Sequence, residues 1–301
     1  MRPPIVLVKF IAITTLAGAL LCSRPAAAGA YIKGLYSMPS TMDPALMNDA
    51  AALTVSNLIY DGLLRFTPDM EIKGALAENW STSPDGKKIT FQLRSGAKFQ
   101  DGTPITAHDV KRSLEHLMTK MSVVYSYYDC INGSAAFHSG TTSHVTGIQI
   151  ISHDTIRIHL KYAYPPFLYV LAGATAKILP QNFIANASFD KKLIGSGPFR
   201  FSHIEKHDAY TDIKLTAFDH YYGGAPKIKE LTLRVMSERE AVRQAAAGLV
   251  HDLATFPLTG KEPIFSAGKD IASPLAATWI IGMNTKAAPF ANLKTRQAFR
   301  Q

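Results

Sequence analysis

The stretch KITFQLRSGAKFQDGTPITAHDVKRSLEHLM, residues 88–118, combines a strand, a turn and a helix. Polar and apolar residues alternate over Lys88–Arg94, which is typical of a strand with one buried face. Asp101–Gly102 supplies a turn, because glycine adopts a positive φ without strain. Thr106 then stands where a helix N-cap is expected, with Asp109 three residues later, so we predict a helix that runs to about Met118.

Strand-like and helix-like segments alternate outward from this stretch, without internal repeats or low-complexity tracts. Pro84–Gly86 predicts a hairpin turn before the quoted strand. The alternation indicates one α/β body. The further predicted strands are Tyr31–Tyr36, Gly147–Ile151, Thr155–Leu160, Gly195–Phe201 with its partner Asp212–Phe218, Lys229–Val235, Leu253–Phe256 and Thr278–Met283. The further predicted helices are Ala50–Leu64, a segment that starts at Tyr164 and ends at Pro180, Glu238–Ala247 closed by Gly248, and one that begins at Leu293.

A series of short motifs runs through the chain. In order they are Thr41–Pro44, Ile59–Leu64, Leu76–Trp80, Phe91–Gly102 with Pro104–Val110, Gly195–Phe199, Tyr221–Pro226, and Asn284–Lys286 with Arg296–Ala298. Each motif alone is a weak signal with an ordinary structural role in a turn, a cap or a strand. In this order they resemble the extracellular solute-binding proteins of family 5, the type that binds oligopeptides, dipeptides and nickel.

This resemblance implies an α/β fold that is periplasmic-binding-protein type II-like, with two lobes around a cleft and an extra inserted domain. By analogy, the large lobe comprises residues 29–60 and 186–272, and the inserted β-rich domain comprises residues 61–185. Residues 273–301 then begin the second ligand-binding lobe. Because members of the family are considerably longer, we expect a C-terminally truncated chain that lacks most of that lobe.

The N-terminal segment predicts export. Arg2 and Lys9 flank the start of an apolar run, Phe10–Leu21, and Ala26–Ala28 fits a cleavage site with small residues. The run is too short for a stable transmembrane helix, which needs about 20 apolar residues. We therefore predict that residues 1–28 are a signal peptide, cleaved near Ala28, and that the mature protein is periplasmic.

We expect different roles for the two cysteines. Lipoprotein anchoring at Cys22 is an alternative to cleavage, but Leu21 stands where that signal needs a small residue, so we do not expect it. Cys130 has no partner for an internal disulfide once the leader is removed. We expect it to be a buried small apolar residue, and the alternative is a thiol whose partner lies in a missing C-terminal segment.

The composition excludes several classes of protein. The formal net charge of +9 over 301 residues is dispersed rather than gathered in runs, so nucleic acid is not an expected partner. The hydrophobic fraction of 47% is enough for substantial cores. The sequence has no His-Glu-x-x-His, no phosphate-binding glycine loop with its lysine and no Gly-x-Ser-x-Gly, and we predict no cofactor.

Two local matches to enzyme chemistry have simpler explanations. Ser95–Lys98 has the Ser-x-x-Lys spacing of penicillin-recognising hydrolases, but it follows a strand and lacks the partner motifs. His203 and His207, four residues apart, would share a face on a helix and could bind a metal with Glu205, yet they lie between two predicted strands. A solvated hairpin tip is the expected arrangement. We therefore predict neither catalytic nor metal-binding residues.

The resemblance also implies positions that face a ligand. The loop after the first strand, an aromatic run in the inserted domain, and strands near the C-terminus carry such positions in the family. Aromatic side chains suit them because a rigid ring offers a large contact area at a small entropy cost, although core packing is the alternative role. The candidate ligand-binding residues are Asn48, Asp49, Tyr125, Tyr127, Thr255, Phe256 and Trp279.

Taken with export, the resemblance implies a monomeric substrate-binding component of an ABC transporter. Such a protein captures peptides or similar small solutes and delivers them to membrane permease subunits that work with a cytoplasmic ATPase. The alternatives are a receptor for a metal complex, a sugar or an opine, and a chaperone-like binder of unfolded chains. The acidic position that pairs with a peptide amino terminus in the family belongs to the lobe that this chain is expected to lack.

Overall fold

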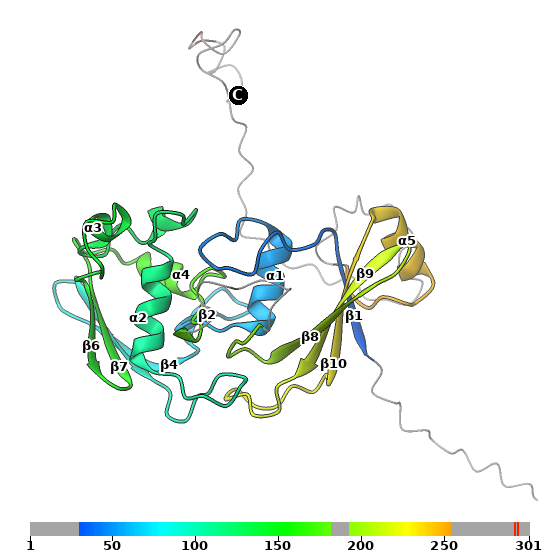
Figure 1. Ribbon diagram of the computed structural model, residues 1–301, viewed down its shortest axis with the longest axis horizontal. Helices are drawn as coiled ribbons and strands as arrows, with labels where there is room; N and C mark the ends of the chain where they lie inside the picture. Colours follow the sequence, from blue (N-terminus) through cyan, green and yellow to red (C-terminus); the bar gives the residue numbers. More distant parts are fainter. Residues whose placement is uncertain (1–29, 182–192, 254–291, 293, 295–301) are drawn as a thin grey trace, which may run out of the picture. The chain divides into compact units, whose positions relative to one another are not determined.

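The computed structural model describes residues 30–181 and 193–253, together with residues 292 and 294. The chain divides into two compact units, residues 1–264 and 265–301. In the second unit, the backbone N–H of Lys294 donates to Oδ1 of Asn292 at 2.8 Å. Figure 1 shows the elements of the first unit. The predicted strand Thr278–Met283, the end of Leu253–Phe256 and nearly all of the last predicted helix lie outside the described residues.

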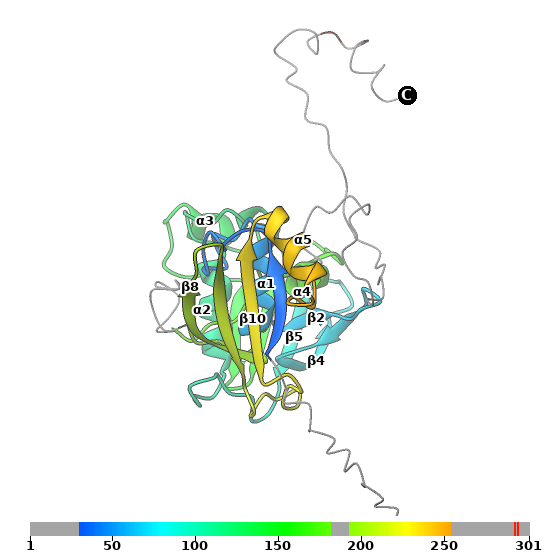
Figure 2. The same ribbon diagram turned by 90° about the vertical axis from the view of Figure 1, so that its right-hand side faces the viewer.

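The first sheet has the strand order β1-β10-β9-β8. Its strands are β1 (Tyr31–Leu35), β8 (Phe199–Lys206), β9 (Tyr210–Ala217) and β10 (Glu230–Met236). β1 pairs in parallel with β10, and the other pairs are antiparallel. Helix α1 (Ala50–Ile59) packs behind this sheet in Figure 2, against β8, and α5 (Glu238–Ala246) follows β10. The predicted strands Tyr31–Tyr36, Asp212–Phe218 and Lys229–Val235 and the predicted helix Glu238–Ala247 are confirmed, with bounds that differ by at most two residues.

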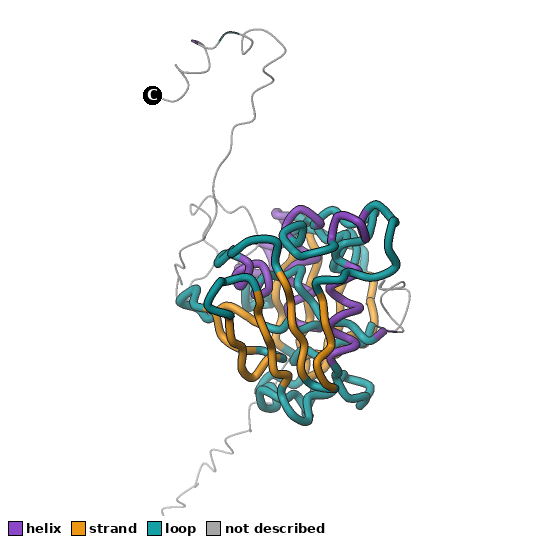
Figure 3. Tube along the Cα trace, turned by 90° about the vertical axis from the view of Figure 1, so that its left-hand side faces the viewer, coloured by secondary structure: helices purple, strands orange, loops and turns teal. Residues whose placement is uncertain are grey.

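The second sheet is antiparallel, with the order β4-β5-β7-β6. Figure 3 shows its strands in orange from the side opposite to the first sheet. The strands are β4 (Ala77–Thr82), β5 (Lys88–Leu93), β6 (Ile148–Ser152) and β7 (Thr155–His159), and a small hairpin joins β2 (Leu64–Phe66) to β3 (Ile72–Gly74). The helical segments are α2 (Ala107–His116), η1 (Tyr125–Tyr127), α3 (Ser134–His138) and α4 (Phe167–Ala172).

Helix α2 begins as the sequence predicts. Oγ1 of Thr106 accepts a hydrogen bond from the backbone N–H of Asp109 at 3.4 Å, and the Asp109 carboxylate accepts one from the backbone N–H of Thr106 at 2.8 Å. This capping box satisfies two backbone donors that the first helical turn leaves free. Val110 and Leu114 are one turn apart and face the core against β6 and β7. The predicted turns at Gly86 and Gly102 are also confirmed, because both have positive φ.

Two predicted helices are shorter than expected. The prediction of Ala50–Leu64 was wrong at its end, because α1 stops at Ile59 and Leu64 begins β2. The backbone N–H of Asp61 instead donates to Oγ of Ser196 at 3.2 Å, and the Asp61 carbonyl accepts from Ile178. The helix predicted from Tyr164 to Pro180 was likewise wrong in length: α4 ends before Gly173, where the backbone becomes extended.

The two sheets meet where residues 59–62 and 194–197 cross. A Cβ on Gly195 would collide with the carbonyl oxygen of Ile59, and one on Gly197 would lie 2.7 Å from the carbonyl oxygen of Leu58. The lack of a side chain at both glycines permits this close crossing. The predicted strand Gly195–Phe201 was wrong at its start, because β8 begins only at Phe199. The backbones therefore approach more closely than any side chain permits.

Gln100 holds this crossing together from the second sheet. Its Nε2 donates to the carbonyl oxygens of Ile59, Gly197 and Phe199 at 3.2, 3.1 and 2.7 Å, and its Oε1 accepts from the backbone N–H of Gly195 at 3.1 Å. The residue is buried. Its amide is thus fully used in joining two segments that are distant in the sequence.

Separate groups of buried residues accompany the two sheets. One lines the second sheet and contains Phe91, Val110 and Ile156, and the other joins α1 to the first sheet through Val55, Ile213 and Leu233. The assignment of residues 29–60 and 186–272 to a large lobe and of residues 61–185 to an inserted domain stays a prediction. Within the described residues, we find no helix with the length and apolarity that crossing a membrane requires.

Candidate functional site

Three segments of the first sheet end at the same edge. β1 is parallel to β10, and residues 250–253 run parallel to β1 on its other side. The backbone N–H of Gly34 donates to the carbonyl of Asp252 at 2.7 Å, and the side chains of Lys33 and Asp252 form an ion pair. In α/β folds, ligands bind outside the carboxyl ends of parallel strands. The loop of residues 36–49, which leaves β1 at this edge and enters α1, is therefore the first candidate.

The inserted domain holds this loop in place. Asp43 accepts a hydrogen bond from the backbone N–H of Ala45 at 2.9 Å and contacts Nε2 of His116, at the end of α2, at 2.6 Å. The backbone N–H of Val123 donates to the carbonyl of Ala45 at 2.9 Å. The segment of residues 121–127 therefore lies beside the loop of residues 36–49, although the two are far apart in the sequence.

Large apolar side chains are exposed along both segments. The most exposed is Met121, at 76%, followed by Tyr127, at 57%. We call this set the apolar edge patch: Tyr36, Met38, Leu46, Met121, Val123 and Tyr127. Exposed apolar residues are ordinary when they are scattered singly, but a gathered group marks a surface that contacts a ligand or another surface. Sequence reasoning found only Tyr127 of this set, since the Val123–Ala45 contact cannot be read from the sequence.

The structure separates the roles of two predicted neighbours, Asn48 and Asp49. Asn48 is exposed, and within the described residues its side chain makes no hydrogen bond. Asp49 instead caps α1, because it accepts from the backbone N–H of Ala52 at 2.8 Å and from the hydroxyl of Ser40. Burial alone would raise the pKa of Asp49, but the hydrogen bonds from Ser40 and Ala52 outweigh it and lower the pKa below its usual value. Asn48 is therefore the freer of the two to contact a ligand.

The predicted tyrosines also differ. Tyr125 is partly buried and stacks on His138, with ring centroids 3.8 Å apart. Tyr127 is exposed and belongs to the apolar edge patch, while Tyr128 beside it is fully buried. Tyr127 is thus the better placed to contact a ligand. Thr255, Phe256 and Trp279 lie outside the described residues.

A groove of about 960 Å³ adjoins the loop on the side of β8. Met38 and Ser40 line one wall, and Phe201, His203 and Lys206 line the other. The prediction that His203 lies between strands was wrong, because it is part of β8. The groove combines apolar and polar groups, as small-molecule sites do, and the sequence reading assigned no ligand role to this part of β8.

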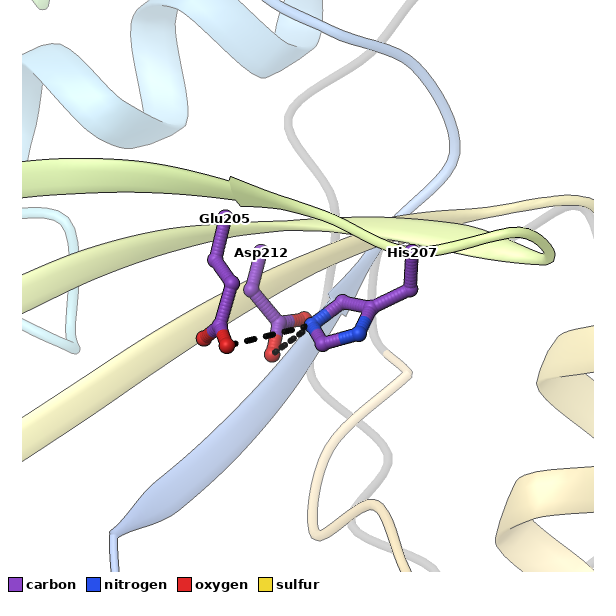
Figure 4. A group of neighbouring side chains, drawn as sticks. All are labelled: Glu205, His207 and Asp212. Carbon is purple, nitrogen blue, oxygen red and sulfur yellow. Dashed lines mark ion pairs between the residues drawn. The ribbon is translucent and has the colours of Figure 1, made fainter.

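Glu205, His207 and Asp212 are the described residues that come nearest to a metal centre, and Figure 4 shows their side chains converging. His207 Nε2 lies 3.8 Å from Glu205 and 3.9 Å from Asp212. However, Arg234 binds both oxygens of Asp212, at 2.8 and 2.9 Å, and Lys214 lies 3.0 Å from the same carboxylate. Lys214 also lies 3.4 Å from Glu205, so two cations already neutralise the two carboxylates, and the arrangement favours an ion-pair network over a metal site.

The Cys130 thiol is buried and free. Burial, and to a lesser degree the neighbouring Asp129, raise its pKa to about 11. A thiol of this kind is unreactive at neutral pH, since the thiolate is the reactive form. This agrees with the expectation of a buried structural residue.

A family model described as "Bacterial extracellular solute-binding proteins, family 5 Middle" matches residues 71–301. The chain belongs to this family. The predicted family and its α/β type II-like fold are confirmed.

Three family 5 relatives illustrate the range of the comparison. The glutathione-binding protein GsiB of Salmonella typhimurium is 28% identical over 300 residues, which cover 96% of this chain and 55% of that protein. AgaA from A. tumefaciens R10, solved with agropinic acid, has a TM-score of 0.63 and 29% identity over 74% of this chain and 43% of AgaA. The murein tripeptide binding protein MppA of Escherichia coli, at 23% identity over 73% of this chain and 45% of MppA, has a TM-score of 0.67 and supports the fold alone. The chain spans about half the length of the relatives that it matches.

Proposed function

We propose that this chain belongs to the solute-binding component of an ABC transporter, which captures a peptide or a similar small solute in the periplasm. The component delivers the solute to membrane permease subunits driven by a cytoplasmic ATPase, acts as a monomer, and makes or breaks no covalent bond. The observation that carries the proposal is the apolar edge patch beside Asn48, at the carboxyl ends of parallel strands, in a chain of family 5.

The site's chemistry suits a short peptide. Exposed Tyr127 and Met121 offer apolar contact to side chains, while Asn48 offers both donors and acceptors to a peptide backbone. No charged side chain of the loop of residues 36–49 is free to fix a terminal charge, since Asp43 pairs with His116 and Asp49 caps α1. We therefore expect the loop to recognise the body of the solute rather than its ends.

Thermal denaturation tests the proposal. The 301-residue chain would be expressed with its own N-terminal segment, purified after export, and melted with increasing amounts of mixed di- and tripeptides, with glutathione as a defined tripeptide. A ligand that binds only the folded state stabilises it by about 2.7 kcal/mol at 100 times its Kd. A saturable rise in Tm is expected. A Tm that none of these peptides changes would contradict peptide binding by this chain.

A non-peptide solute is the second candidate. The relative AgaA, which was solved with agropinic acid, is 29% identical to this chain, whereas MppA, which is described as a murein tripeptide binding protein, is 23% identical. Melting the chain with an opine in the same series distinguishes a peptide solute from a non-peptide solute. A rise in Tm with an opine but not with peptides would favour this second candidate.

We propose that the chain is exported, on the basis of its N-terminal segment. The charged start, the apolar run and Ala26–Ala28 support cleavage after Ala28. Intact mass and N-terminal sequencing of the secreted product test this directly. A mature chain that begins at Gly29 is expected, whereas a lipid-modified Cys22 would contradict it.

A further inference from the structure

A separate cavity of about 560 Å³ lies where the two sheets meet. The loop that follows β5 forms one side, through Lys98 and Asp101, and the start of β8 and the residues after β9 form the other, through Arg200 and His220. None of the residues of the apolar edge patch lines it. Gln100 also lines the cavity, but its amide is fully used in the crossing, so it takes no further partner.

Arg200 has an unusual position in this cavity. Its guanidinium lies over the ring of Phe218, with Cζ 4.5 Å from the ring centroid. Its Nε is buried and has no hydrogen-bond partner, and among the described residues the guanidinium forms no ion pair. A buried charged donor without an acceptor destabilises a protein, and such a group in a native fold calls for an explanation, of which an unseen ion is one.

A second basic residue, Lys98 in the loop that follows β5, lines the same cavity as Arg200. Lys98 is exposed, and within the described part of the chain its ammonium has no carboxylate partner. His220 lies at the rim on the side of Arg200, edge-on to Phe218 with ring centroids 6.3 Å apart. Two permanent positive charges, one from the loop that follows β5 and one from β8, therefore line one cavity.

The acidic groups nearby do not balance these charges. The Asp101 carboxylate is held within its own turn, because Oδ1 accepts from the backbone N–H of Thr103 at 2.9 Å and from its hydroxyl at 2.6 Å. Asp219 pairs with Lys229 at 2.6 Å and is mostly exposed. With Lys98, Arg200 and Asp101 counted, the cavity keeps a positive charge even when His220 is neutral.

We propose that this cavity binds a small oxyanion, a phosphate or a carboxylate group of a free solute, between Arg200 and Lys98. The planar guanidinium presents donors that match two oxygens of such a group, and Lys98 supplies a point charge from the opposite side. The bound anion neutralises the guanidinium of Arg200 and links the start of β8 to the loop that follows β5. Because it lies apart from the apolar edge patch, the site is independent of the captured solute.

Inorganic phosphate is the first probe. The purified 301-residue chain would be melted, and titrated by calorimetry, in phosphate and in chloride at the same ionic strength and pH, with acetate as the carboxylate arm. A saturable rise in Tm that chloride does not reproduce is expected. Acetate that matches phosphate would identify a carboxylate site, and acetate without effect would identify a phosphate site.

Two variants and a control test the residues. Arg200→Gln is expected to abolish the phosphate effect and Lys98→Gln to weaken the affinity about tenfold, whereas Lys73→Gln, on exposed β3 and lining no described cavity, is expected to leave both unchanged. Lys98 is exposed, so its variant keeps the test valid should Arg200→Gln fail to fold. Equal phosphate effects in all variants, or no effect in the unmodified chain, would overturn the proposal.

Discussion

The hydroxyl of Tyr222 donates a hydrogen bond to Oδ2 of Asp61 at 2.7 Å, although the two residues are 161 positions apart in the sequence. Tyr221 donates to the same oxygen at 3.0 Å. Asp61 is buried, and burial raises the pKa of its carboxyl above the usual value even though both tyrosines and Lys177 act in the opposite direction. Three distant segments thus converge on Asp61, since its backbone also binds Ser196 and Ile178.

Tyr222→Phe is expected to lower the free energy of unfolding by about 1–3 kcal/mol, because it removes one of the two hydroxyl donors from a buried carboxylate. Urea denaturation measures the change. Tyr169→Phe is the matched control, since Tyr169 is 56% exposed and its hydroxyl makes no hydrogen bond within the described residues. Equal losses in both variants would show that the Asp61 contact contributes no stability.

Lys177 makes the joint sensitive to alkaline pH. Burial lowers the pKa of its ammonium from 10.5 to about 8, with Asp61 acting in the opposite direction. Between these values the unfolded state binds more protons than the folded state, so stability rises with pH from about 8 to about 10.5. The gain is on the order of 3 kcal/mol.

Lys177→Met is expected to lose this rise, whereas Lys73→Met, at an exposed position, is expected to keep it. Urea midpoints measured at intervals from pH 7 to 11 would show the difference, because the remaining titrating groups are the same in all three proteins. A ¹³C titration of the Lys177 side chain checks the pKa directly. A titration midpoint near pH 10.5 would show that burial does not lower the pKa of Lys177, and would contradict this prediction.

Gly195→Ala tests the crossing of the backbones. Its Cβ would collide with the carbonyl of Ile59, which is backbone and cannot rotate away. We expect a loss of about 3 kcal/mol, as in other overpacked sites. Gly96→Ala is the comparison, because Gly96 has a φ of +74° but nothing within 4 Å of an added Cβ, so it should lose only about 1 kcal/mol. Similar losses would mean that the crossing can relax.

The sequence predicts local features of this fold well. The capping box needs only Thr106 and Asp109, three residues apart, and the turn at Gly102 needs only a glycine after an aspartate. The end of α1 is different, because it depends on a contact between Asp61 and Ser196, which are 135 residues apart. The apolar periodicity continues to Leu64, but that side chain is buried in the core of the other sheet.

The candidate site likewise contains residues that the sequence predicts and residues that depend on contacts between distant segments. Asn48 could be found because a motif places it after Asp43 and Pro44. The apolar edge patch as a whole could not be found from the sequence, because Leu46 and Val123 become neighbours only through the hydrogen bond from Val123 to Ala45. Asp49 is a candidate because it stands beside Asn48, yet the spacing from Asp49 to Ala52 is also that of a helix cap.

Asp212 is expected to support stability down to acidic pH. Burial alone would raise the pKa of Asp212, but the hydrogen bonds from Arg234 and Lys214 hold it below 3.8. Since the folded pKa is lowered, the stabilisation is present above pH 3.8 and is lost as the pH falls through the folded value. Asp212→Asn should therefore cost about 3–5 kcal/mol at pH 7, because it leaves Arg234 without its carboxylate, and less at pH 3.

Asp219→Asn is the control for this pair, because Asp219 is 67% exposed and pairs with Lys229 at the surface. We expect a change within about 1 kcal/mol. Urea denaturation at pH 7 and pH 3 measures both variants. Addition of Zn²⁺ to the unmodified chain should not raise the Tm, and a saturable rise that Asp212→Asn abolishes would show that the network of Figure 4 is a metal site after all.

Asn48 and Tyr127 are expected to contribute to solute affinity without contributing to stability. Both are exposed, and Asn48 makes no hydrogen bond within the described residues, so Asn48→Ala and Tyr127→Ala should change the free energy of unfolding by less than about 0.5 kcal/mol. If they contact the solute, each should weaken binding about 5- to 30-fold, as the loss of about 1–2 kcal/mol of contact implies.

Tyr162→Ala is the matched control, because Tyr162 is 50% exposed but lies outside the apolar edge patch. Calorimetric titration with whichever peptide or opine raises the Tm of the unmodified chain measures all three variants. Unchanged affinity in Asn48→Ala and Tyr127→Ala would place the solute elsewhere, and the groove between Met38 and Lys206 would then be the next surface to substitute. Equal weakening in Tyr162→Ala would instead show that the loss reflects a general effect on the fold, since this tyrosine has no predicted contact with the solute.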